Sequence, residues 1–112
     1  MDCIFCKIIS GEIPSKKVYE DEKCYAFIDI SPQAPVHVLV IPKAHIASAD
    51  DINEENSDAV AAVFKAIPVI AKSLSLTRGY RVVTNCGPDA CQSVTHLHFH
   101  ILGGRQMSGE MG

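Results

Sequence analysis

The feature that most constrains the fold is the segment Val94–Leu102, in which histidine alternates with large apolar residues. A β-strand turns successive side chains to opposite faces, so we expect His96, His98 and His100 to share one face. The apolar side chains between them would then pack against the core. A shift of one residue in strand pairing would exchange the two faces, so the pattern also fixes the register of the strand.

The other runs along the chain predict an α+β protein, with an antiparallel sheet of about five strands. One long helix and a short N-terminal helix complete the prediction. The expected elements are a helical turn at Ile4–Ile9, strands at Lys17–Glu20, Cys24–Asp29, His37–Ile41 and Tyr80–Asn85, a helix at Glu54–Leu74, and the histidine strand itself.

Two of these elements carry more specific expectations. The segment His37–Ile41 is apolar on both faces, so we expect a buried central strand. The long helix contains Pro68, which removes a backbone donor and is expected to kink it. Its expected apolar stripe consists of residues at three-to-four spacing, namely Val60, Val63, Phe64, Ile67, Ala71 and Leu74.

Length and charge exclude several classes of protein. A chain of 112 residues fits one domain spanning residues 1–112. The net charge of −3 argues against a nucleic-acid surface, which would normally carry a basic stripe. We find no secretory signal and no apolar stretch long enough to span a membrane. The five cysteines are therefore expected to be reduced, and the protein to be cytoplasmic.

A row of three imidazoles on one face suits a phosphate ester. Adjacent members would lie about 7 Å apart and the outer pair about 13 Å, so one metal ion cannot bind all three. A neutral imidazole brings no negative charge to an anionic phosphate and is a sensible nucleophile, provided that an acceptor holds it in the right tautomer. The competing interpretation is three solvent-facing polar residues on an edge strand.

The segment from His96 to Leu102 is similar to the histidine triad motif, His-φ-His-φ-His-φ-φ, where φ is apolar. The sequence Gly-Gly-Arg-Gln-Met that follows it, and Ile30–Pro35 upstream, resemble the Hint branch of the histidine triad (HIT) superfamily, the histidine triad nucleotide-binding proteins. An N-terminal Cys-x-x-Cys pair is typical of bacterial members. The fragile-histidine-triad branch of dinucleotide hydrolases ends the motif differently. The resemblance implies a single HIT domain.

This resemblance implies a purine nucleoside phosphoramidase, which hydrolyses the P–N bond of AMP- or GMP-linked amines. His98 would be the nucleophile, forming a nucleotidyl-histidine that water later cleaves, and the carbonyl of His96 would orient it. His100 would bind the phosphate, and His37 would relay a proton to the leaving amine. The triad histidines and His37 are thus the implied catalytic residues.

The remaining implied contacts are polar residues for the phosphate and a mostly apolar slot for the nucleoside. Implied for the phosphate, beside His98 and His100, are Asn85, Gln92 and Ser93, and for the nucleoside Phe5, Ile8, Phe27, Asp29 and Ile30. Each also has an ordinary structural interpretation as a core or turn residue. The chain carries Ala90-Cys91 where relatives often have glycines, and its tail lacks the aromatic residue of some relatives.

The pair Cys3 and Cys6 supplies half of a tetrahedral metal site, or it could be redox-active or simply buried. In bacterial relatives that the chain resembles, a Cys₂His₂ zinc site is completed by two histidines, which here are His45 and His96. All four positions would be occupied by protein, so the zinc would be structural and no catalytic metal is expected.

Two other functions remain open. A metal-dependent hydrolase would need a carboxylate near the histidines, and Asp29 or Asp89 could supply it. A nucleotide-binding adaptor with vestigial catalysis would need the apolar slot but not His98. The expected partners are a purine nucleotide or nucleoside phosphoramidate and, by resemblance, a second copy in a homodimer, with no nucleic acid and no membrane.

Overall fold

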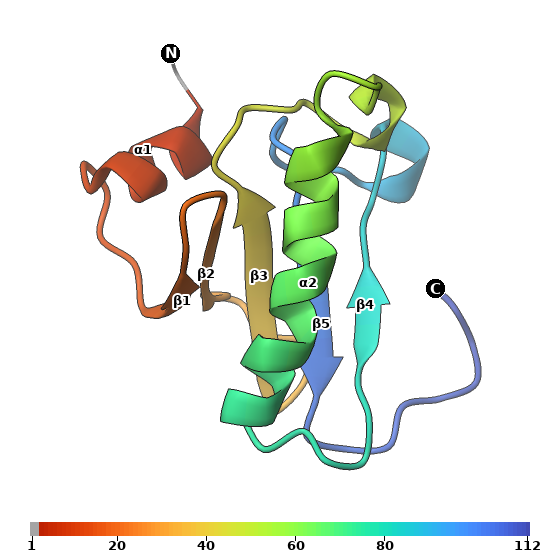
Figure 1. The fold of residues 1–112 in the computed structure, drawn as a ribbon. Coiled ribbons are helices and arrows are strands. Elements are labelled where there is room, and N and C mark those ends of the chain that lie inside the picture. Colours follow the sequence, from red (N-terminus) through yellow and green to blue (C-terminus); the bar gives the residue numbers. More distant parts are fainter. Residues whose placement is uncertain (1–2) are drawn as a thin grey trace.

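The computed structural model describes residues 3–112 and contains one five-stranded sheet. Every neighbouring pair is antiparallel, and the strand order is β1-β2-β3-β5-β4. The strands are β1 (Lys17–Glu20), β2 (Cys24–Ile28), β3 (Val36–Pro42), β4 (Arg81–Val83) and β5 (Phe99–Gly103); the helices are α1 (Ile4–Ser10) and α2 (Ser57–Ser73), with short 3₁₀ turns at Ala49–Asp51 and Pro88–Ala90. The predicted α+β class is confirmed (Figure 1).

Strand β3 lies in the middle of the sheet and is buried on both faces, as its sequence predicts. Val38 and Val40 belong to the core on the α2 side, whereas Leu39 and Ile41 belong to a second cluster on the opposite side. This alternation follows from the two-residue period of a strand. The sheet therefore separates two apolar clusters.

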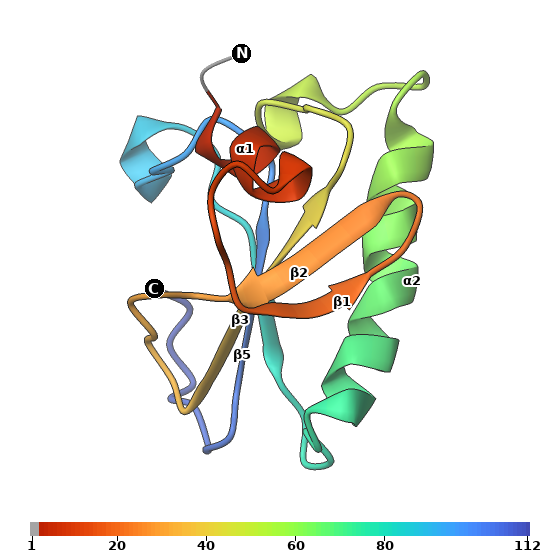
Figure 2. The same ribbon diagram turned by 90° about the vertical axis from the view of Figure 1, so that its left-hand side faces the viewer.

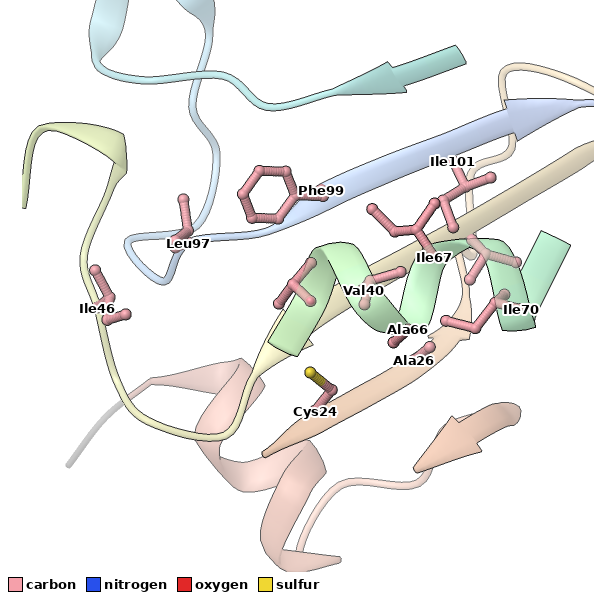
Figure 3. Close-up of a cluster of buried hydrophobic side chains, with 12 residues drawn as sticks. Cys24, Ala26, Val40, Ile46, Ala66, Ile67, Ile70, Leu97, Phe99 and Ile101 are labelled. Atoms are coloured by element: carbon pink, nitrogen blue, oxygen red, sulfur yellow. The ribbon is translucent and has the colours of Figure 1, made fainter. Parts of the chain in front are cut away.

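The larger core lies between α2 and the sheet (Figure 3), where Ile67 and Ile70 of α2 meet Val40 and Ile101. The helix begins three residues later than predicted because the side chain of Asn53 accepts hydrogen bonds from the next amides and holds a turn there. It continues through Pro68 to Ser73.

One member of the predicted stripe of α2 is wrong. Phe64 is 51% exposed, although its ring touches that of Phe99, and Ile70, which the prediction omitted, is fully buried. The buried stripe is therefore centred closer to Ile70, and Phe64 lies at its margin. No helix among residues 3–112 is long and apolar enough to cross a membrane.

Helix α1 covers the face of the sheet opposite α2 (Figure 2). Its Phe5 and Ile8 are buried against Phe27 and Leu39. The helix starts where the Cys3 sulfur accepts a hydrogen bond from the amide of residue 6, and it ends at Gly11, whose φ of 87° is the left-handed conformation that glycine adopts readily. The two helices thus lie on opposite faces of the sheet, and α1 covers only one part of its face.

The predicted histidine strand is too long at its N-terminal end. Only Phe99–Gly103 joins the ladder, because the partner strand ends at Pro42, which has no N–H to continue it. The carbonyl of Pro42 instead accepts a hydrogen bond from the ring of His96, and the amide of Leu97 donates a hydrogen bond to the carbonyl of Ile46. Residues 94–96 form a bend, and residues 97 and 98 lead from it into β5.

The division into two faces nevertheless continues through this segment. Leu97, Phe99 and Ile101 all lie in the α2-side core, as predicted. The rings of His96 and His98 lie on the other side against Phe5. These two imidazoles are buried rather than facing solvent, because α1 covers them.

Candidate functional site

The middle triad histidine, His98, presents one ring nitrogen without a protein partner. Its Nδ1 lies 2.7 Å from the carbonyl oxygen of His96, so in the neutral ring Nδ1 carries the proton and Nε2 does not. Nε2 has no hydrogen-bond partner among the described residues, and no fully buried side-chain nitrogen there lacks one. Solvent therefore reaches Nε2, although the residue as a whole is only 4% exposed.

The third triad histidine, His100, belongs to a second group of titratable side chains with His37 and Asp29. Nε2 of His37 lies 2.8 Å from Nδ1 of His100 and 3.4 Å from a carboxylate oxygen of Asp29. The rings of His98 and His100 have centroids 5.2 Å apart. The backbone of β3 and β5 fixes these positions, since Leu39 pairs with His100.

Burial keeps this group of imidazoles neutral. Desolvation lowers the pKa of His37, and the nearby Asp29 carboxylate only partly opposes this effect. Desolvation, followed by the neighbouring His98 and His37, lowers the pKa of His100 to about 4. Both rings are therefore uncharged near pH 7, where each has one N–H donor and one acceptor nitrogen.

Beside these histidines lies a mostly apolar hollow with a volume of about 950 Å³, of a size that accepts a small organic ligand. Strand residues form its floor and α1 forms one wall. The residues of the predicted site that line it are Phe5, Ile8, Phe27, Asp29, Ile30, His37, Ser93 and His100. Ile30 is 98% exposed at the rim, so it is free to cover a bound ring.

Four residues predicted for the site do not line the hollow: Asn85, Gln92, His96 and His98. The ring of His98 lies next to two lining residues, 5.1 Å from the Phe5 ring and 5.2 Å from the His100 ring. Gln92 has both ends of its amide bonded to backbone, accepting from Gly87 and donating to the carbonyls of residues 47 and 94. These hydrogen bonds hold the loop that carries Ser93 in place.

A separate cluster brings together the four residues predicted as metal ligands. Nδ1 of His96 lies 3.4 Å from the Cys3 sulfur, 3.6 Å from the Cys6 sulfur and 3.1 Å from Nδ1 of His45. In a tetrahedral zinc site with Zn–S near 2.3 Å and Zn–N near 2.0 Å, ligand atoms lie about 3.3 to 3.8 Å apart. The four side chains can therefore hold one metal ion with little movement.

The tautomer of His96 also fits metal binding. Its Nε2 lies 2.9 Å from the carbonyl of Pro42 and must donate there, which leaves Nδ1 unprotonated and facing the cluster. Burial lowers the pKa of His96, so the ring is held in the neutral form that coordinates metals. Two thiols and an unprotonated Nδ1 converging with the second imidazole make a donor set suited to zinc.

Several residues of the site were not predicted from the sequence. The backbone amide of Gln33 donates to Nδ1 of His37 at 3.0 Å, and Ile4, Ile28 and Leu39 line the hollow. The apolar residues could have been found by extending the alternation of their strands and helix. The role of Gln33 depends on a main-chain group in a loop, for which a sequence carries no signal.

Comparison with known proteins gives consistent matches. A family model described as HIT domain matches residues 10–107. The chain is 47% identical to a 14 kDa zinc-binding protein of Brassica juncea, over 99% of the chain and all of the relative. It is 46% identical to a protein of Arabidopsis thaliana named adenylylsulfatase HINT1, covering 97% of the chain and 76% of the relative.

Two solved structures match over nearly their whole length. A histidine triad protein from Clostridium difficile superposes with a TM-score of 0.94 at 49% identity, covering 99% of this chain and 97% of the other. A HIT family hydrolase from Clostridium thermocellum has a TM-score of 0.95 at 50% identity, covering 98% and 96%.

Proposed function

Because this chain belongs to the HIT domain family, we propose that it is a hydrolase acting on purine nucleotides, and more specifically a nucleoside phosphoramidase of the Hint branch. One observation carries the proposal. The Nδ1 proton of His98 is held by the carbonyl of His96, so the free Nε2 is a nucleophile in the correct tautomer. It lies beside a hollow that carries an apolar slot, a carboxylate and a histidine donor.

The proposed reaction has two steps. Nε2 of His98 attacks phosphorus, the P–N bond breaks, and its electron pair leaves with the amine, which takes up a proton. Water then attacks the nucleotidyl-histidine, the bond from phosphorus to Nε2 breaks, and the nucleoside monophosphate is released. The carbonyl of His96 accepts from Nδ1 throughout and stabilises the positive charge that develops on the ring.

We assign the binding roles by position in the hollow. His100 and Ser93 donate to the phosphate, and Asp29 accepts from the ribose hydroxyls. Phe5, Ile8, Phe27 and Ile30 form the slot for the base. Asn85, which is half-buried but outside the hollow, and Gln92, whose amide is engaged with backbone, stay predictions as phosphate contacts.

We propose that the metal of the Cys3, Cys6, His45 and His96 cluster is zinc, in line with the names of two plant relatives. When bound, the ion would supply a structural cross-link between the two thiolates and the two imidazoles. These ligands would attach α1, and with it the Phe5 wall of the slot, to the segment that precedes β5. We also retain, as proposals, a single domain, a cytoplasmic homodimer and the purine preference.

A second leaving group merits a direct comparison, since one relative is named an adenylylsulfatase. The same attack by His98 on an adenylyl sulfate would break the bond from phosphorus to the sulfate oxygen and release sulfate. Adenylation of His98 is common to both substrates. Only the leaving group, and its need for a proton, differs.

The test is single-turnover kinetics with a fluorogenic adenosine phosphoramidate and, in parallel, adenylyl sulfate. We expect near-complete loss of both activities in His98→Ala, little change with a chelator, and a nucleotidyl adduct that can be trapped in the wild type. The matched control is Asp89→Ala in the exposed turn at residues 88–90, which should keep full activity.

Full activity in His98→Ala would refute the proposed function. Retained nucleotide binding with no turnover in the wild type would favour the nucleotide-binding adaptor. Loss of activity on chelation, with His98→Ala still active, would favour a metal-dependent hydrolase.

A further inference from the structure

The hydrogen bond between Gln33 and His37 fixes where His37 carries its proton. A backbone N–H can only donate, so Nδ1 of His37, 3.0 Å from the Gln33 nitrogen, is the acceptor. A neutral imidazole has one proton, which must therefore be on Nε2. The loop that positions this amide is itself held by Asp29, whose carboxylate accepts from the amide of Ser31 at 2.7 Å.

The proton on Nε2 of His37 in turn fixes the tautomer of His100. Since Nε2 of His37 carries a proton and lies 2.8 Å from Nδ1 of His100, the His37 ring donates and the His100 nitrogen accepts. The proton of neutral His100 is then on its own Nε2. That nitrogen has no partner among residues 3–112 and is not fully buried, and the residue lines the hollow.

We infer that His37 is a positioning residue that holds His100 in the tautomer with a proton on Nε2, which donates toward the phosphate. The main-chain amide of Gln33 decides which atom donates in each hydrogen bond of the series from Gln33 through His37 to His100. The inference rests on the proposed function for the identity of the phosphate. It assigns no proton transfer to His37. If neutral His37 gave its Nε2 proton to His100, neither of its nitrogens would carry a proton, and Gln33 cannot supply another.

The leaving amine must therefore obtain its proton from a donor other than His37, such as water. The Asp29 carboxylate reinforces the same tautomer, because it lies 3.4 Å from the same Nε2 and also requires a donor there. Thus the Gln33 amide and the Asp29 carboxylate independently favour the proton on Nε2 of His37.

The first test needs no variant and no substrate. Nitrogen-15 shifts of the imidazole rings distinguish a protonated nitrogen from an unprotonated one. In the wild type near pH 7 we expect both His37 and His100 to show protonated Nε2 and unprotonated Nδ1. Protonated Nδ1 on His100 would overturn the inference, whatever the enzyme hydrolyses.

The second test separates positioning from proton relay. The amide N–H of a glutamine can donate to Nδ1 of His100 but cannot pass on a proton, so His37→Gln should retain activity within about tenfold of the wild type. His37→Ala should lose about 100-fold or more and show a mixture of His100 tautomers. Equal, large losses in His37→Gln and His37→Ala, with the His100 tautomer unchanged in both, would establish a relay instead.

These readouts can be told apart from failure of the proposed function. A protein with no phosphoramidase activity but with both imidazoles protonated at Nε2 would retain the inference and lose the function. An active His98-dependent enzyme with the opposite tautomers would do the reverse.

Discussion

Two clusters of side chains that could bind a metal lie on the same side of this sheet, and the histidines His96 and His37 within them adopt different states of protonation toward the cluster. In the first cluster, Nε2 of His96 donates to a carbonyl, so its Nδ1 faces the cluster without a proton. In the second cluster, formed by Asp29, His37 and His100, Nδ1 of His37 accepts from an amide, so the nitrogen facing the cluster carries a proton. A protonated nitrogen cannot coordinate a metal ion.

Donor atoms of each cluster lie within 4.8 Å of one another, so proximity alone does not separate them. The two clusters differ in the main-chain group that binds the outward-facing ring nitrogen of one histidine, which is a carbonyl for His96 and an amide for His37. A carbonyl there prepares the imidazole for a cation, and an amide prepares it to donate a hydrogen bond. We therefore expect one metal ion per chain.

The largest effect should follow from removing the first cluster. Cys3→Ser with Cys6→Ser should reduce bound zinc from about one equivalent to nearly none. Because a ligand stabilises only the folded state, the loss should be about 4 kcal/mol when free metal exceeds its dissociation constant about 1000-fold. Elemental analysis and urea denaturation measure the two effects. Cys86→Ser, outside both clusters, is the control and should change neither.

The next largest effect should come from Phe5, whose ring contacts His96 of one cluster and lies against His98 near the other. Phe5→Ala should destabilise the fold by about 3 kcal/mol, because a large side chain only 6% exposed is removed. It should also weaken nucleotide binding in calorimetry while zinc stays bound. Val69→Ala, on the exposed side of α2, should cost less than about 0.5 kcal/mol.

A smaller effect should appear as the pH falls. The folded-state pKa of His100, about 4, is below the unfolded value of about 6.5, so between these limits the unfolded chain binds more protons. Stability that is present above pH 6.5 is therefore lost progressively down to pH 4, by about 1 to 2 kcal/mol after allowance for solvent screening.

Denaturation at fixed metal across this range checks the sign. His100→Gln should have a shallower slope than the wild type. A wild type that becomes more stable on acidification would contradict the assignment of a neutral, buried His100.

The smallest effect should appear in a variant that removes the distinction between the clusters. Gln33→Pro deletes the amide that fixes the tautomer of His37, so Nδ1 can take the proton and Nε2 can coordinate. Cobalt titration followed by absorption should then detect a second, weaker equivalent of metal. Gln33→Ala keeps the amide and should bind one equivalent, like the wild type. One equivalent in both variants would show that Gln33 does not control metal binding.

Much of the fold was predictable because the local pattern of apolar and polar residues agrees with the secondary structure that each segment adopts. Strand β1 matches its predicted bounds, and β3 was predicted as central from its two apolar faces. The errors arise where tertiary partners decide. Pro42 ends the ladder that the alternation of residues 94–102 would have continued, and Phe64 faces outward although its spacing suits the core.

Most members of the site were predictable, and so were the contacts of His96 and His98. The resemblance indicated the four metal ligands, which do meet, and the lining residues from Phe5 to His100. The resemblance also implied that His96 joins the cysteines and that the His96 carbonyl orients His98, and both contacts are found, whereas the hydrogen bond between His100 and His37 was not predicted. The main-chain amide of Gln33 sets the donor and acceptor in the pair of His37 and His100, and side-chain identities do not encode that amide.

His96 contributes to two places at once, through its ring and through its carbonyl. The ring of His96 is held between the cysteine sulfurs and the carbonyl of Pro42. This restricts the orientation of the His96 carbonyl, which accepts the hydrogen bond from the His98 ring. The hydrogen bond from Nδ1 to this carbonyl thereby restrains rotation of the His98 side chain, although His96 does not line the hollow. A substitution of the His96 ring leaves the carbonyl in the chain, so its effect on turnover would measure the rigidity of that restraint.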